Sequence, residues 1–166
     1  MLFARRRIKP ERDGTFSLKL PEEERSVLSH LAEQLSDLLL RADRAAGEDE
    51  AVDRLFPAAY SEEEDWAKDA EFRVMRGEAL LDHHRGALSI IVSTAGQDRL
   101  TGEEAYAWMQ ALNQLRLVLG SRLGVTEEGD EEANLSEDHP AAHGFLLYHY
   151  LTMLQGELIE ALAADL

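Results

Sequence analysis

The sequence contains no cysteine among its 166 residues. Without thiols the chain cannot form a disulfide, an iron–sulfur cluster, a cysteine-based zinc site or a catalytic thiolate. These four kinds of chemistry are therefore excluded for this sequence.

Positive charge is also scarce. The 17 lysines and arginines stand against 33 aspartates and glutamates, which gives a formal net charge of −16 at pH 7. A field of that sign repels phosphate and argues against general nucleic-acid binding by the body of the protein. A hydrophobic content of 45% is too high for a disordered chain, and the length fits one domain with one core.

Apolar runs long enough for a membrane helix are missing as well. The charge-free run between Arg85 and Asp98 includes serine and threonine and falls short of the roughly 18 apolar residues that a span requires. Residues 1–7 place apolar side chains before three arginines, the reverse of a secretory signal. We therefore expect a cytoplasmic protein with no membrane segment.

Local patterns predict the first elements. Residues 1–20 alternate in the manner of a β-hairpin, with turn residues at Arg12-Asp13-Gly14. Pro21 and three following glutamates are typical of a helix start, and the apolar stripe continues to about Arg44. A short helix near Val52 is expected to stop at Pro57.

Three more helices follow in the sequence pattern. One runs from a capping box at Ser61 to Thr94, either unbroken or as two helices joined by a kink near Gly77 and Gly86. Another begins with a capping box at Thr101 and is expected to stop at Gly124. The last one follows Pro140.

We predict a mainly α fold, a single-domain helical bundle of five to six helices with an N-terminal β-hairpin. The parts are the hairpin (1–20), a helical core (21–124), an acidic loop (125–139) and a C-terminal helix (140–166). The acidic stretch has no apolar periodicity, and we expect it to be dispensable for folding.

The sequence offers little for catalysis or metal binding. His139 and His143 have the i, i+4 spacing of zinc helices, but Pro140 places the first of them outside the helix. His84 lies on an apolar stripe, where a hydrogen-bonded core histidine is the usual explanation. The sequence has no nucleophile elbow and no phosphate-binding glycine loop. We expect no enzyme activity, no metal and no cofactor.

The basic residues concentrate near the start of the chain. Five of the 17 occur within the first twelve residues, namely Arg5, Arg6, Arg7, Lys9 and Arg12. On a hairpin they can contact an acidic protein surface or phosphate. Alternatively, they protect a strand edge from pairing or neutralise the protein's own acids.

Three stretches resemble a known bacterial family. They are residues 55–60 (LFPAAY) leading to 70–73 (AEFR), residues 107–125 (AWMQALNQLRLVLGSRLGV) and residues 150–155 (YLTMLQ). Their order and spacing resemble DUF2017, a domain of unknown function from high-GC bacteria. Polar residues of unknown role in or beside these motifs are Arg73, Asn113, Arg116 and Arg122.

The resemblance implies a cytoplasmic, mostly helical protein with no established catalytic activity. Some members carry a transcriptional-regulator label, including a cysteine-dependent redox role that a chain without cysteine cannot share. Members also tend to be encoded beside the adaptor of the Clp protease, which suggests a setting in regulated proteolysis by association alone.

Two functions follow as hypotheses. The first is a non-enzymatic module that binds another protein, or a second copy of itself, through the hairpin, whose outward edge would offer unpaired N–H and C=O groups. The second is a transcriptional regulator that contacts DNA through the basic hairpin, which the net charge of −16 opposes.

Overall fold

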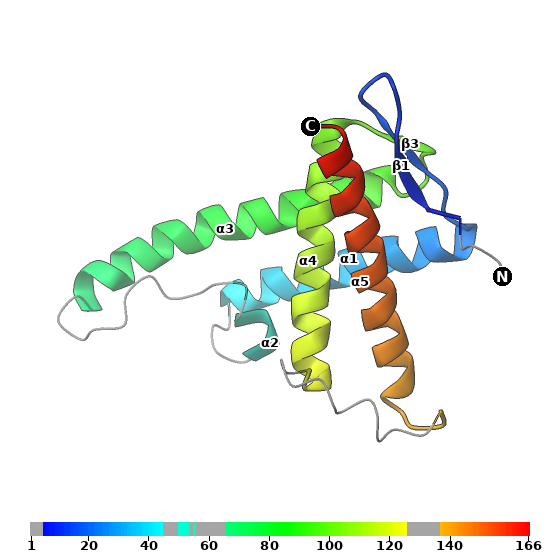
Figure 1. Ribbon diagram of the computed structural model, residues 1–166. Helices are drawn as coiled ribbons and strands as arrows, with labels where there is room; N and C mark the ends of the chain where they lie inside the picture. Colours follow the sequence, from blue (N-terminus) through cyan, green and yellow to red (C-terminus); the bar gives the residue numbers. More distant parts are fainter. Residues whose placement is uncertain (1–4, 45–49, 54, 56–65, 126–136) are drawn as a thin grey trace.

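Helices dominate the computed structural model, which describes residues 5–44, 50–53, 55, 66–125 and 137–166 (Figure 1). The helices are α1 (Glu22–Arg44), α2 (Glu50–Asp53), α3 (Trp66–Thr94), α4 (Gly102–Leu123) and α5 (Ala142–Ala164). The strands are β1 (Ile8–Pro10), β2 (Phe16–Leu18) and β3 (Arg99–Leu100). The mainly α fold class is confirmed. The described part holds four long helices and the single turn α2, so the expected five to six helices are not matched.

The expected number of helices is too high partly because α3 does not divide into two helices. This helix of 29 residues continues through Gly77 and Gly86 without a break, so the kinked alternative is wrong. A glycine inside a helix costs about 1 kcal/mol relative to alanine, which a long helix packed on two others can absorb. The capping box expected at Ser61 and most of the acidic loop lie outside the described residues.

Local signals explain where other helices begin and end. Pro21 directly precedes α1, and three glutamates occupy its first turn, where the helix dipole favours negative charge. Thr101 caps α4 through a complete capping box with Glu104. Gly124 ends α4 in the left-handed conformation at φ 71°, which glycine adopts without strain.

The four long helices form two layers. Figure 1 shows α4 and α5 side by side in front, with α1 and α3 crossing behind them. Two glycines let α4 and α5 approach closely. A Cβ on Gly120 would lie 3.0 Å from Tyr148 Cε2, and one on Gly144 would lie 2.8 Å from Leu123 Cδ2.

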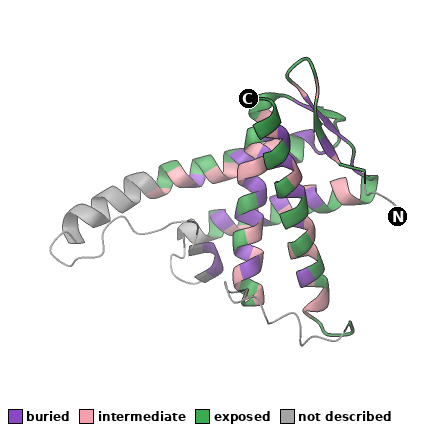
Figure 2. Cartoon of the chain, viewed as in Figure 1, coloured by how far each residue is buried: buried purple, intermediate pink, exposed green. Residues whose placement is uncertain are grey.

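The core lies between these layers, and buried residues recur along all four long helices (Figure 2). Trp108 is fully buried at its centre, and its indole Nε1–H donates to Thr94 Oγ1 at 2.7 Å. This bond satisfies the one polar group of the indole and joins α4 to the end of α3.

The predicted hairpin is present and forms part of a three-stranded antiparallel sheet. Ile8 pairs with Leu18 between β1 and β2, while Phe16 pairs with Leu100 between β2 and β3. Gly14 completes the hairpin turn at φ 81°. Ile8, Phe16, Leu18 and Leu100 are buried against the helices, so the ribbon gains its stability from them.

Candidate functional site: the N-terminal sheet

The β1 edge of the sheet lies against α5. One carboxylate oxygen of Glu157 accepts hydrogen bonds from the backbone N–H groups of Arg7, at 2.7 Å, and Ile8, at 3.2 Å. Pro10, the next residue on this strand with Ile8's orientation, has no N–H to offer. On the β1 side of the sheet, the N–H groups of Arg7 and Ile8 that the expected open edge would offer are therefore already bound within the chain.

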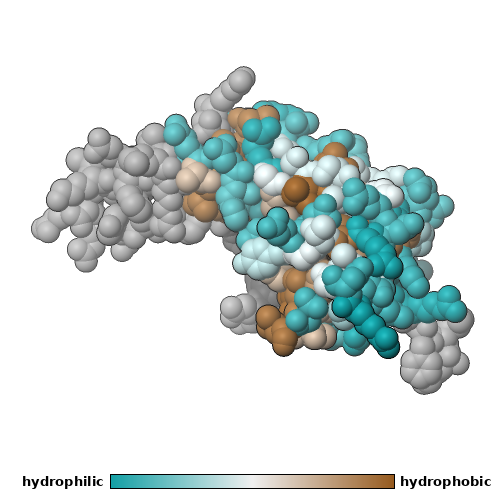
Figure 3. All heavy atoms as spheres, turned by 90° about the horizontal axis from the view of Figure 1, so that it is seen from above, coloured by the Kyte–Doolittle hydropathy of each residue, from teal (hydrophilic) through white to brown (hydrophobic). Residues whose placement is uncertain are grey.

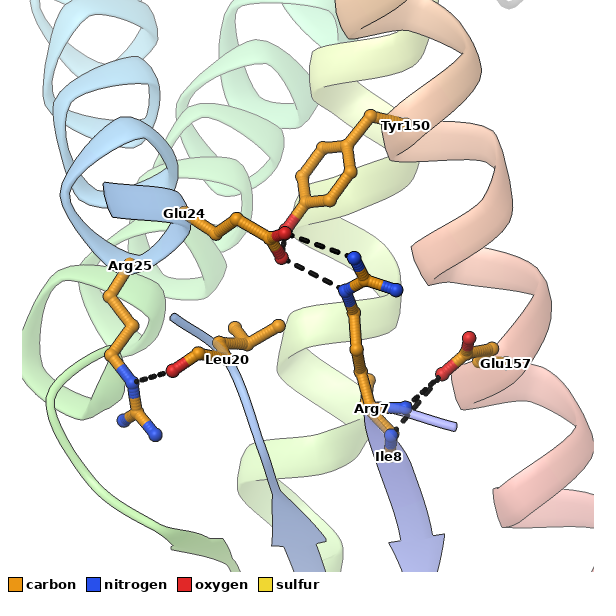
Figure 4. A network of polar contacts seen from close by, with 7 residues as sticks. All are labelled: Arg7, Ile8, Leu20, Glu24, Arg25, Tyr150 and Glu157. Carbon is orange, nitrogen blue, oxygen red and sulfur yellow. Dashed lines mark hydrogen bonds and ion pairs between the residues drawn. The ribbon is translucent and has the colours of Figure 1, made fainter. Parts of the chain in front are cut away.

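A second carboxylate joins three elements. Arg7 donates from Nε and Nη2 to the two oxygens of Glu24, both at 3.0 Å, in a bidentate pair between the strand and α1. The Tyr150 hydroxyl of α5 donates to the same carboxylate at 2.7 Å. Figure 4 shows the three side chains converging beside Glu157.

This environment changes the acidity of all three groups. The hydrogen bonds from Arg7 lower the pKa of Glu24, and the same bonds raise the pKa of Arg7. Burial, followed by the hydrogen bond to Glu24, raises the pKa of Tyr150 well above its ordinary value. Each shift favours the protonation state that the network uses, a neutral phenol and a charged pair.

Arg25 holds the other end of the sheet, and sequence reasoning missed it. Its guanidinium donates to the backbone oxygens of Leu20 and Leu18 and to those of Ala95 and Gln97 after α3. It also forms an ion pair with Asp98 at 3.0 Å, and only 11% of the arginine side chain is exposed. An arginine directly after three glutamates gave the only signal, and it resembles ordinary surface charge.

The basic residues predicted as an interaction site divide into two groups. Arg7 is committed to Glu24, and Arg6 forms an exposed ion pair with Glu160 of α5 at 2.7 Å. Arg5, Lys9 and Arg12 are exposed, and no side chain of these three forms a hydrogen bond or ion pair within the part of the chain described here.

Strand alternation adds two cations that the sequence analysis did not single out. Register places Lys9, Ser17 and Arg99 in one row across the three strands, on the side opposite the core. Lys19 shares this outer face because its N–H donates to Arg7 O, two residues before Lys9. Arg99 pairs with Asp13 at 3.2 Å. We call Arg5, Lys9, Arg12 and Lys19 the sheet cations. Figure 3 looks onto this end of the molecule, where the surface is largely hydrophilic.

The family-motif residues do not join this site. Arg116 of α4 donates to Thr152 Oγ1 at 2.9 Å and to Gln155 Oε1 at 2.7 Å, so it bridges α4 and α5 through uncharged partners. Asn113 and Arg122 are exposed on α4. The side chain of Arg73 lies outside the described part of the structure.

Two hollows lie between the long helices. An apolar one of about 90 Å³ lies between α1, α4 and α5, with Gln34 and Arg122 among its lining residues. A polar one of about 340 Å³ lies between α1 and α3, lined in part by Glu33, Asp37 and Arg85. Within the described residues no three His, Asp or Glu side chains gather in a way that could hold a metal ion.

Two histidines contact the backbone of the chain. His84 Nε2 lies 3.1 Å from the backbone oxygen of Leu55, and burial lowers the pKa of its ring. His139 Nδ1 accepts from the N–H of Ala141 at the start of α5, at 3.1 Å.

The part of the chain that the structure describes contains no helix with the length and apolarity to cross a membrane.

Comparison with known proteins decides the family. The family described as "Domain of unknown function (DUF2017)" matches residues 5–162, nearly the whole chain. The chain belongs to the DUF2017 family. No solved structure matches it.

Curated relatives of this DUF2017 protein come from mycobacteria. The chain is 35% identical over 94 residues to "Oxidative stress regulator AosR" of Mycobacterium tuberculosis strain H37Rv, covering 54% of this chain and 42% of that protein. It is 33% identical over 116 residues to "Putative oxidative stress regulator AosR" of Mycobacterium leprae, covering 68% of this chain and 52% of the relative. The chain thus spans about half the length of the curated relatives it matches.

Proposed function

We propose that this DUF2017 protein is a regulatory protein that acts by binding another protein through the sheet cations, without catalysis of its own. The partner would present an acidic surface. The helical layers would serve as the support that holds the sheet in a fixed orientation.

The sheet cations carry this proposal. The chain has 33 acids, and Arg6 and Arg7 each pair with one of them. By contrast, the side chains of Arg5, Lys9, Arg12 and Lys19 pair with no acid in the described part of the chain. Exposed cations on a strongly acidic protein favour one docking direction, because an acidic partner is repelled everywhere else.

The contacts that hold the sheet support the same proposal. Glu157 fixes the edge of β1, Glu24 fixes Arg7, and Arg25 fixes the segment that leads out of the hairpin. A surface held by several elements loses little conformational entropy on binding. The sheet that carries these cations is therefore already held in place before a partner binds.

The names of the relatives support a regulatory role in oxidative stress. This sequence has no cysteine, so a thiol switch within it is excluded. We therefore propose that another component senses the oxidant. This chain would then transmit or limit the response of its partner. The setting in regulated proteolysis that the family resemblance implies stays a prediction.

Site-specific photo-crosslinking tests the proposal. A photoreactive residue replaces Arg12 in cells of the organism that encodes the chain, and a second strain carries it at Arg41, an exposed arginine on α1. We expect a discrete protein adduct from position 12 and none from position 41. Reversal of Lys9 and Lys19 to glutamate should abolish the adduct.

DNA binding through the same cations is the alternative that the experiment separates. The proposal predicts weak DNA affinity that falls with salt and ignores sequence. If the protein instead binds a defined promoter fragment tightly near physiological salt, and reversing the charge of Lys9 and Lys19 abolishes that binding, the protein is a DNA-binding regulator and the proposal is wrong. Absence of a protein adduct at position 12 would also refute it.

A further inference from the structure

The polar hollow between α1 and α3, with a volume of about 340 Å³, is lined by charged groups of both signs. Glu33 and Asp37 line it from α1, and Arg85 lines it from α3. Because the two acids are one helical turn apart, they lie on the same side of α1, with about 6 Å between their Cβ atoms. The hollow therefore has two negative groups on one helix and a positive group on the other.

Arg85 is partly buried, yet it has no carboxylate partner within the described part of the chain. Its guanidinium makes one hydrogen bond there, a long one of 3.4 Å from Nε to Ser36 Oγ. The terminal nitrogens Nη1 and Nη2 donate to no described atom, although their four hydrogens can bind a carboxylate in a bidentate manner. Arg7 and Arg25, by contrast, each pair with an acid.

The remaining lining adds hydroxyl groups and apolar surface. Ser36 and Ser89 supply one hydroxyl from each helix. Ala32, Leu88 and Val92 supply apolar atoms, and the first two of these residues are fully buried. A few polar groups around an apolar surface are typical of small-molecule sites, whose volumes begin at about 300 Å³.

We propose that the polar hollow binds a free α-amino acid with a short apolar side chain. The carboxylate of the ligand accepts hydrogen bonds from the terminal nitrogens of Arg85, and its ammonium group donates to Glu33 and Asp37. A simple anion would be repelled by the two acids, and a simple cation would be repelled by the guanidinium. The site therefore selects a molecule that carries both charges.

The binding is expected to be weak, because Glu33 and Asp37 are exposed and pairs with exposed charges contribute little. For a ligand of fewer than about ten non-hydrogen atoms, this corresponds to a dissociation constant on the order of 1 mM. None of the residues that line the hollow belongs to the sheet cations. The inference therefore does not depend on the proposed function.

Titration of the isotope-labelled full chain with L-valine and L-leucine, followed by amide chemical shifts in nuclear magnetic resonance, tests this inference. We expect saturable shifts at Ser36 and Ser89 for at least one of the two amino acids. Two analogues of leucine test whether both charges are needed: isocaproate lacks the ammonium group, and isoamylamine lacks the carboxylate. Each analogue should bind at least about 10-fold more weakly than leucine.

Substitutions assign the two charges to their walls. Arg85→Met should weaken leucine binding at least about 10-fold. Combining Glu33→Gln with Asp37→Asn should also weaken leucine binding, but it should strengthen isocaproate binding because the repulsion of its carboxylate is removed. Arg12→Met is the matched control: it changes the net charge by the same amount, and Arg12 is exposed and does not line the hollow.

Far-UV circular dichroism checks that each variant keeps its helices, and the variant with both acids replaced carries the test if Arg85→Met unfolds. The proposal is wrong if neither amino acid gives a saturable shift up to about 50 mM. Isocaproate or isoamylamine binding as tightly as leucine would also overturn it, as would a folded Arg85→Met variant that binds leucine as tightly as the wild type.

Discussion

Replacement of Arg25 by methionine should destabilise the protein strongly. Methionine keeps most of the apolar stem but removes every donor of the guanidinium. The change therefore leaves the backbone oxygens of Leu18, Leu20 and Ala95, all partly buried, without the donor they use now.

The expected loss follows from these bonds. Each partly buried bond from a charged donor contributes about 1 kcal/mol or somewhat more, so three of them contribute about 3 kcal/mol. The ion pair with Asp98 adds little because that carboxylate is 92% exposed. For a chain of this size, about 3 kcal/mol lowers the melting temperature by roughly 10 °C.

Urea unfolding followed by tryptophan fluorescence and far-UV circular dichroism measures this loss. Arg41→Met is the matched control on the same helix, because the Arg41 side chain is exposed and forms no hydrogen bond or ion pair within the described chain. It should change the free energy of unfolding by no more than about 0.5 kcal/mol. If Arg25→Met costs less than about 1 kcal/mol, the idea that Arg25 holds the sheet to the end of α3 is wrong.

Two further predictions concern Glu24 and the glycines of the long helices. Because the folded-state pKa of Glu24 is lowered, its contribution is present above the unfolded value and is lost as pH falls through the folded one. The difference in unfolding free energy between wild type and Glu24→Gln should therefore shrink between about pH 5 and pH 3, and a constant difference would contradict it. Gly86→Ala should stabilise the protein by about 0.5 to 1 kcal/mol, because no atom lies within 4 Å of the added Cβ. Gly120→Ala should not, because its Cβ would press on the Tyr148 ring; equal thermal shifts for the two variants would refute the close approach of α4 and α5.

Features set by neighbouring residues were predictable from the sequence. The start of α1 after Pro21, the capping box at Thr101 and the stop at Gly124 each depend on a few consecutive residues, and all three are confirmed. The hairpin is confirmed for the same reason. The strand β3 was not predicted, because two residues are too few to show alternation.

The contacts of the site could not be predicted, because they join residues far apart in the chain. Arg7 meets Glu24 after 17 residues but meets Glu157 only after 150. In a chain with 33 acids, sequence gives no means to choose the carboxylate that a given arginine will use. Which N-terminal cations are structural and which are exposed therefore became clear only from the structure, which shows how α5 packs on the sheet.

Survival under oxidative stress tests the central claim most directly. The strain to measure carries, at its native locus, the protein with Arg5, Lys9, Arg12 and Lys19 changed to glutamate. The comparison strains carry the wild-type protein, Arg41→Glu or a deletion. If the chain regulates by contact through the sheet cations, the quadruple variant should be as sensitive to peroxide as the deletion, at an unchanged protein level, while Arg41→Glu should behave as wild type. If deletion sensitises the cells and the quadruple variant protects them fully, the sheet cations are not the functional surface.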